Sequence, residues 1–384
     1  VGYSAEKEKG EAILKPLRLA RRFLFVLIAV LVVVSPFLIF SAHAAEPSLT
    51  SILNYLGFTN RALSSVQTFS AGTYNFTLWA EFAGYHATNN LSYYQVNTSV
   101  FNLIFSGPEG GSGYVNPPIS KSFTISYQFG LSMFSGDGYR YFTETSRNPD
   151  GYQHAKVYQN LNVPGMYLIG FENLYGQQAD RDFNDMVISL CPQYQVTFNQ
   201  TGVGTDFSGT VVTTNGTGYG VGNLPKSFWW NKYSIHSFSF ASPLNVNASK
   251  RYIWNSTSGL STLQSGTLNV TSSGSVTGNY KTQYYLTVDN GGHGTATGEG
   301  WYYAGSSASF SISPTTVSGG TGTQYVFTGW IGSGTGSYTG PDASHSVTMN
   351  NPITETAQWK TQYKLTVFSA HDSPVPSVGE HWYD

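Results

Sequence analysis

Two neighbouring stretches decide the fold of this chain: residues 165–174, with the sequence GMYLIGFENL, and residues 180–190, with the sequence DRDFNDMVISL. Each contains a short apolar run typical of a buried strand, and a polar segment joins them. Four carboxylates fall within fourteen residues of this connection, at Glu172, Asp180, Asp182 and Asp185. Only 10% of the chain is charged, so this density is unusual. We therefore expect two strands joined by an acidic loop.

Carboxylates this close repel one another unless a cation lies among them or water solvates them. The pattern therefore indicates either a site for a hard divalent cation, most plausibly Ca²⁺, or an acidic surface loop. At a cation site, Asp180 and Asp182 would be loop ligands, and Glu172 would reach the ion from the preceding strand. Asp185 or Asn184 would complete the ligand set, unless these two side chains instead cap a turn.

An EF-hand loop does not fit this stretch. Asp180, Asp182 and Asn184 have the spacing of positions 1, 3 and 5 of such a loop. Asp185 then stands where the loop needs Gly, and Cys191 stands where it needs Glu. The residues that follow predict a strand and not a helix, which leaves only a looser cation site.

The amino-terminal residues 1–44 have the organisation of a secretory signal. A basic flank precedes an apolar core of eighteen residues, 23–40, and residues 42–44 form the small-x-small pattern Ala-His-Ala. Eighteen residues also approach the length that spans a bilayer, so a retained anchor is the alternative, and a pilin-type leader is a third. All three place the remaining chain outside the cytoplasm.

Composition beyond this segment predicts an exported all-β protein of two to four domains. Aromatic residues make up 15% of the chain, and 42 Gly supply turns. Six of the 19 Lys and Arg and three of the 21 Asp and Glu lie in residues 1–22, which leaves 13 basic and 18 acidic residues, a balance of −5. Nucleic-acid binding is not indicated, because no basic patch is present. The single Cys191 excludes an internal disulfide, and we expect it to be buried.

Residues 45–66 predict a short helical lead-in to the first domain. Apolar residues at helical spacing begin at Leu49, Gly57 interrupts them, and residues 61–66 are compatible with a second turn. The segment is expected to pack on the domain that follows.

Residues 67–191 predict a β-sandwich or jelly-roll-like domain. Residues 73–82 alternate, which predicts that Tyr74, Phe76, Leu78, Ala80 and Phe82 share one face and that Asn75, Thr77, Trp79 and Glu81 share the other. Further strands are expected at residues 99–105, 122–129 and 154–159, with Gly- and Pro-rich turns between them.

At this point a family resemblance is visible. Residues 72–190 resemble an exported domain known as domain of unknown function 4114, whose pattern is Gly-Phe-Glu-Asp-Leu, an acidic loop, then Asp-x-Asp-Phe-Asn-Asp. Residues 170–174 and 180–187 carry this pattern, and residues 148–151 with His154 also fit. Asn173 replaces the usual Asp, which removes a charge but keeps a carbonyl oxygen. The resemblance implies a β-rich domain of bacterial and archaeal surface or secreted proteins, without established enzymatic activity.

The remainder predicts tandem β modules. The pattern Gln-Tyr-x-hydrophobic-Thr-hydrophobic starts at Gln193 and recurs at Gln283 and Gln362. We expect modules at 192–282 and 283–361, either Ig-like or β-grasp-like, and the start of a further repeat at 362–384. Trp229, Trp230 and Trp254 in the first module would be core residues or a sugar-stacking platform.

The second module resembles the B-type repeat of internalin-like bacterial surface proteins. The carrying stretches include residues 291–295, GGHGT, residues 325–330, YVFTGW, and residues 352–359, PITETAQW. This resemblance implies an extracellular spacer or an adhesive module.

Known catalytic motifs are absent from the sequence beyond residues 1–44. The eight His are scattered, there is no Gly-x-Ser-x-Gly, Walker loop or Cys-x-x-Cys, and Ser-x-x-Lys occurs only at Ser4–Lys7 in the predicted signal segment. Carboxylate pairs of the glycosidase type need only meet in space, so sequence does not test them. Eight Asn-x-Ser/Thr sequons would be surface positions if the host glycosylates exported proteins.

We therefore expect a non-enzymatic secreted or cell-surface protein with a calcium-binding head and a repeat stalk, serving adhesion or envelope structure. The expected partners are cell-surface glycans or proteins, including further copies of the chain, and the membrane is involved only if residues 1–44 are retained. The alternative is a calcium-dependent carbohydrate-binding module of an extracellular protein. A secreted hydrolase is a third hypothesis.

Overall fold

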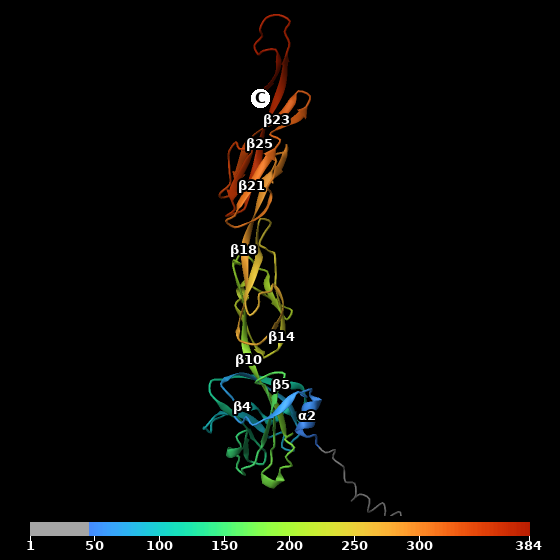
Figure 1. Cartoon of the computed structure of the whole chain (residues 1–384), viewed down its shortest axis with the longest axis vertical. Helices are drawn as coiled ribbons and strands as arrows, with labels where there is room; N and C mark the ends of the chain where they lie inside the picture. Colours follow the sequence, from blue (N-terminus) through green and yellow to red (C-terminus); the bar gives the residue numbers. More distant parts are fainter. Residues whose placement is uncertain (1–45) are drawn as a thin grey trace, which may run out of the picture.

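The computed structural model describes residues 46–384, and the predicted signal segment 1–44 lies outside the described residues. The prediction of an all-β fold is confirmed, because strands dominate every part of this range. Figure 1 shows a broad head at one end, two β modules stacked in a column above it, and a terminal hairpin beyond them. Within residues 46–384, no helix has both the length and the apolar composition needed to cross a membrane.

The head is a sandwich of two antiparallel sheets. The first sheet contains, in spatial order, β1 (Arg61–Ser64), β8 (Ala155–Asn160), β9 (Tyr167–Phe171), β10 (Met186–Thr201), β2 (Gly72–Glu81) and β5 (Gly113–Ile125). The second sheet contains β4 (Phe101–Phe105), β3 (Asn90–Gln95), β6 (Phe129–Phe134) and β7 (Arg140–Phe142). A one-turn helix, α3 (Gly107–Gly110), lies between β4 and β5.

Both faces of the first sheet are covered. Phe76 and Ile188 from the first sheet meet Phe129 and Leu131 from the second sheet in the main core. The opposite face packs against α2 (Leu49–Tyr55), whose apolar side chains form a second cluster with Leu168, Val187 and Cys191. The expectation that Cys191 is buried is therefore confirmed.

The predicted lead-in is helical only in its first part. Ser48 caps α2, and Gly57, with φ of 83°, ends it. The prediction of a second helical turn at 61–66 is wrong, because Arg61–Ser64 forms the edge strand β1, which pairs with β8. Hydrogen bonding to a neighbouring strand overrides the weak local helix signal here.

The predicted alternation of residues 73–82 holds for its first half only. Tyr74, Phe76 and Leu78 lie in the main core as expected. Trp79 has no partner in the ladders, so the register shifts and Ala80 packs instead in the cluster under α2. This β-bulge also turns Glu81, which was predicted to face outward, into the interior.

Three long strands cross from one domain into the next. β10 ends the head and begins the first module, β18 (Gly274–Asp289) joins the two modules, and β25 (Ile353–Val367) leads into the terminal hairpin. The boundaries that the sequence suggested at 192, 283 and 362 therefore fall inside continuous strands. Neighbouring domains are joined by paired backbone and not by a free linker.

The two modules share one topology. The larger sheet of the first module has the order β13–β10–β18–β16–β15, and that of the second has the order β20–β18–β25–β23–β22. In each sheet, the incoming strand pairs in parallel with the strand that leaves the module. The remaining strands of these sheets are β13 (Lys226–Asn231), β16 (Lys250–Gly259), β15 (Leu244–Asn245), β20 (Gly300–Tyr303), β23 (Thr323–Ser333) and β22 (Thr316–Gly320).

A smaller sheet closes each module into a sandwich. The strands are β12 (Thr217–Gly220), β11 (Thr210–Thr214), β14 (Ile235–Phe240) and β17 (Ser265–Asn269) in the first module, and β19 (Thr295–Thr297), β21 (Ser307–Ser313) and β24 (Ser344–Thr348) in the second. Residues 192–384 contain no α-helix. This arrangement is Ig-like rather than β-grasp-like, because a grasp fold needs a helix across its sheet.

The terminal hairpin repeats the opening of the second module. β25 pairs antiparallel with β26 (Gly379–Tyr383), as β18 pairs antiparallel with β20. Leu286 is fully buried, whereas Leu365, its counterpart in the repeat pattern, is 46% exposed. The hairpin therefore has the backbone of a further repeat and an uncovered apolar face.

Insertion of a flexible Gly-Ser-Gly-Ser segment between Pro192 and Gln193 tests the continuity of β10. Head and first module should then move independently, since β10 is the one strand of residues 46–384 that crosses this boundary. Small-angle X-ray scattering of residues 46–384 should show a shorter and broader distribution of interatomic distances. The same insertion in the β11–β12 turn, between Asn215 and Gly216, should leave that distribution as in the wild type. An unchanged distribution for the 192/193 insertion would contradict a role of β10 in stiffening.

Candidate metal centre

The acidic loop is closed at its base by the pairing of β9 with β10. Phe171, the last residue of β9, is directly opposite Met186, the first residue of β10. Glu172, which directly follows β9, therefore lies close to Asp185, which directly precedes β10. The apolar runs on both sides of the loop hold β9 and β10 together, because their side chains fill the sandwich core on one face of the sheet and the cluster under α2 on the other.

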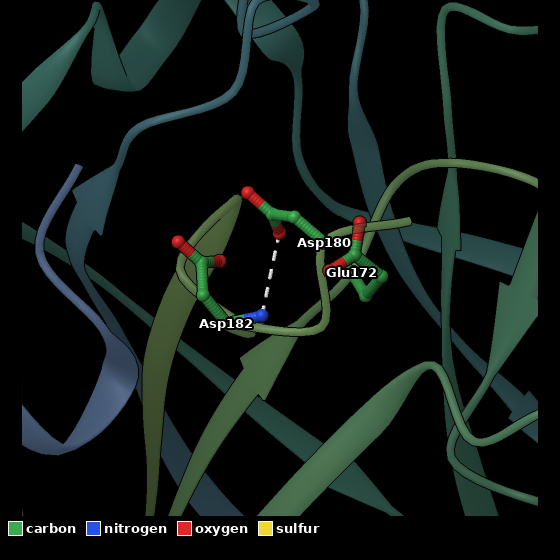
Figure 2. Close-up of side chains that lie close together, drawn as sticks. All are labelled: Glu172, Asp180 and Asp182. Atoms are coloured by element: carbon green, nitrogen blue, oxygen red, sulfur yellow. Dashed lines mark hydrogen bonds between the residues drawn. The ribbon is translucent and has the colours of Figure 1, made fainter. Parts of the chain in front are cut away.

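Three of the predicted ligands form a compact group. Carboxylate oxygens of Glu172, Asp180 and Asp182 lie within 4.8 Å of one another. Figure 2 shows Asp180 and Asp182 on the loop and Glu172 beside them, with the Asp182 backbone N–H donating to Oδ1 of Asp180 at 3.3 Å. Glu172 is buried, Asp182 is half-buried and Asp180 is exposed, so the group opens to solvent on one side.

Asn184 joins this group through Asp182. Its backbone N–H donates to Oδ1 of Asp182 at 3.1 Å, and its side-chain Nδ2 donates to Oδ2 at 2.5 Å. The same Nδ2 reaches the carbonyl of Pro47 at 3.1 Å, and the Leu49 N–H donates to the carbonyl of Asp182. The start of α2 thus holds the loop in place from outside the sheet.

Asp185 lies on the other side of Glu172. Its Oδ2 accepts a hydrogen bond from the Asn173 N–H at 2.8 Å, and its carboxyl group contacts that of Glu172. The Arg181 N–H donates to Oε2 of Glu172 at 3.0 Å. The five residues predicted from the sequence therefore share one neighbourhood, in which Glu172 links the group of three to Asp185.

The loop backbone is strained at two positions. Arg181 and Phe183 have φ of 62° and 60°, in the left-handed region that costs a residue with a side chain about 1–2 kcal/mol. Burial of Phe183 beneath α2 helps to hold this conformation. The alternation brings the side chains of Asp180, Asp182 and Asn184 to one side of the loop.

A buried histidine supports the loop from the interior. His154 Nδ1 donates to the carbonyl of Glu172 at 3.1 Å, and Nε2 lies 2.9 Å from Oδ2 of Asp150. Both ring nitrogens therefore face oxygen atoms, one on the loop and one on the Asp150 side chain. Asp150 also accepts from the Gly176 N–H at 2.8 Å, and Tyr141 stacks on the ring. Sequence reasoning gave these residues no role, although the family resemblance had included Asp150 and His154.

The carboxylates hold their protons unusually tightly. Burial, reinforced by neighbouring carboxylates, raises the pKa of Asp182 to about 6, of Glu172 to about 7 and of Asp185 to about 9. None of the ion pairs within residues 46–384 includes these groups or Asp180. The guanidinium group of the adjacent Arg181 stacks over Tyr152 instead. The negative charge is therefore not balanced by a basic side chain of the described chain.

Comparison with known proteins supports the resemblance for part of the head. Residues 116–192 match the family described as Domain of unknown function (DUF4114). This segment covers β5 to the first part of β10 and includes the acidic loop. No curated protein matches the chain. No solved structure matches it either.

The stability of the metal-free head should fall as pH rises from about 4 to about 9. Ordinary carboxyl groups in the unfolded chain release their protons near pH 4, whereas the folded head holds them to higher pH. The folded state binds more protons in this window, so the free energy of unfolding decreases with pH. Scanning calorimetry of residues 46–384 in chelator would measure the decrease. Asp185→Asn mimics the protonated side chain, so the free energy of unfolding of this variant should decrease less steeply with pH. A decrease as steep as in the wild type would contradict a raised pKa of Asp185.

Proposed function

We propose that this protein is a non-enzymatic, secreted or cell-surface β protein whose head is stabilised by Ca²⁺ and whose modules form a stalk. The ligands would be Glu172, Asp180, Asp182, Asn184 and Asp185. One observation carries the proposal: four carboxylates, two of them buried, share a loop without a basic partner in the described chain. Such a group is relieved either by protons or by a cation.

Calcium suits this arrangement better than other common ions. It takes six to eight oxygen ligands from carboxylates, amide carbonyls and water at flexible angles, whereas Mg²⁺ demands a near-octahedral set. The loop offers only oxygen ligands, and its exposed Asp180 leaves room for water. A dissociation constant on the order of 10⁻⁴ to 10⁻³ M is sufficient for an extracellular module. The ion would tie β9 to β10 and hold the loop between them.

The modules would form a stalk that extends from the head. Continuous β10, β18 and β25 support a stiff stalk, and the resemblance of residues 283–361 to internalin B-type repeats supports an extracellular spacer. Adhesion or cell-envelope structure is the role that this combination favours, with surface glycans or proteins as partners.

A carbohydrate-binding role is the second candidate. Trp230 and Trp254 pack against the core of the first module, but Trp229 is 46% exposed on β13 and is available for stacking on a sugar ring. Binding of residues 46–384 to a polysaccharide panel, lost in Trp229→Ala, would favour this role over a purely structural stalk.

Calcium should raise the melting temperature of the head. At a hundredfold excess over the dissociation constant, the gain is about 2.7 kcal/mol, which corresponds to roughly 10 °C for a domain of this size. Asp182→Asn should lose most of the shift, because it removes a charged ligand at the centre of the group. Scanning calorimetry of residues 46–384 in calcium, in magnesium and in chelator measures this shift in melting temperature.

Glu46→Gln is the matched control for this variant. Glu46 is exposed and raises the pKa of Asp182 through its charge, but it is outside the compact group of carboxylates. It should therefore keep nearly the full calcium shift. If Asp182→Asn keeps it as well, the cation assignment is wrong.

A further inference from the structure

A second buried acidic group lies inside the head, on β2 and not on the acidic loop. Glu81 at the end of β2 is completely buried, and neither of its carboxylate oxygens has a hydrogen-bond partner among the described residues. The ion pairs of residues 46–384 do not include it. A buried carboxylate with two unpartnered oxygens is among the most costly arrangements in a protein interior, so another group must compensate it.

Two buried amides accompany Glu81. Asn89 is completely buried beside it, and both its Oδ1 and its Nδ2 lack a partner within the described chain. Asn173, which directly follows the ligand Glu172, is also buried, with Nδ2 unpartnered in the same range. A chain of contacts links Asn173 to this end of the sandwich: its carbonyl accepts from Ser135 Oγ at 2.8 Å, and the next residue, Gly136, packs against Thr88.

The one-turn helix α3 closes the space over Glu81. A Cβ added to Gly110 would lie 3.0 Å from Oε2 of Glu81, and one added to Gly107 would lie 2.5 Å from the backbone of Ala87. Glycine at these positions lets the turn lie directly on the carboxylate and on the segment before Asn89. Gly107 N–H also donates to Oδ1 of Asn90 at 3.1 Å, which fixes that segment.

We propose that Glu81 and Asn89 form a second, interior site for a hard divalent cation, with Ca²⁺ the best-suited ion. Both Glu81 oxygens and the Asn89 Oδ1 would be ligands, and backbone carbonyls or trapped water would complete the set. Asn173 is bound to the loop, since its backbone N–H donates to Asp185. The two ions would be held at the same end of the sandwich by different residues.

A proton is the competing way to neutralise Glu81. Burial raises the pKa of Glu81 to about 9, so the metal-free head would carry a neutral acid here at pH 7. A neutral Glu81 would be satisfied if its O–H donated to Asn89 Oδ1 while Asn89 Nδ2 donated to the other carboxyl oxygen, and the Asn89 amide is close enough to lower the pKa of Glu81 by hydrogen bonding. Well-formed hydrogen bonds of this pair are not present in the structure, where all four atoms are without a partner among the described residues, whereas a divalent cation would take both carboxylate oxygens and the amide oxygen together.

Calcium stoichiometry separates the two explanations. Equilibrium dialysis of residues 46–384 at millimolar calcium should give two ions per chain. Glu81→Gln should lose one ion while keeping the loop ion, and Asp182→Asn should do the reverse. The two variants therefore report on the interior site and on the loop site independently.

Gln is also the closest mimic of a protonated Glu, which makes the variant decisive. If Glu81→Gln folds, binds as many ions as the wild type and melts at the wild-type temperature in chelator, Glu81 is a neutral buried acid and the proposal is overturned. If Glu81→Gln does not fold, the variant Asn89→Asp tests the interior site instead. With a cation site, Asn89→Asp keeps both ions and gains a larger calcium-dependent rise in melting temperature. With a neutral acid, it is destabilised equally with and without calcium.

Discussion

Backbone hydrogen bonding along β10 is the constraint on which the rest of the structure depends. Residues 187–192 pair with β2, and residues 186–190 also pair with β9, so this part of the strand is central in the head. Residues 193–201 pair with β13 and β18 in the first module. One strand therefore fixes the base of the acidic loop and the start of the stalk. Pro192 at the crossing lacks an N–H, but its carbonyl accepts from Lys232, which continues the bonding across the boundary.

Packing on both faces explains why the loop can be acidic. The main core and the cluster under α2 supply the apolar burial that holds β9 and β10 together. The loop itself is unfavourable, because its carboxylates repel one another and two of its residues have positive φ. These features are tolerated because the packed structure around the loop fixes its conformation. Strain and unbalanced charge at one place are common at binding sites, where a ligand supplies what the protein leaves out.

Patterns with a local cause were predictable from the sequence. Strand periodicity gave the all-β class, the burial of Tyr74, Phe76 and Leu78, and the clustering of the carboxylates around Asp182. The bulge at Trp79 was not predictable, because it depends on register with β5 and β10 and leaves no local signal. For the same reason, the interior position of Glu81 could be found only in the structure.

The contacts that residues distant in the sequence make with the acidic loop could not be predicted from a sequence pattern either. His154 and Asp150 contact the loop because β8 lies beside β9, and the spacing of these residues does not indicate that contact. The continuity of β10, β18 and β25 from one domain into the next was not predictable from the sequence either. The repeat at Gln193, Gln283 and Gln362 marked where each module begins, but a repeat does not say whether a linker or a strand joins two modules.

The parallel pairing of incoming and outgoing strands has a mechanical consequence. In the first module, β10 and β18 run in the same direction along the long axis, and so do β18 and β25 in the second. Tension along that axis pulls the lower end of one strand against the upper end of its neighbour. The hydrogen bonds between them are then loaded in shear and must break together rather than one at a time. The two stacked modules are thus suited to bearing a pulling force along the column.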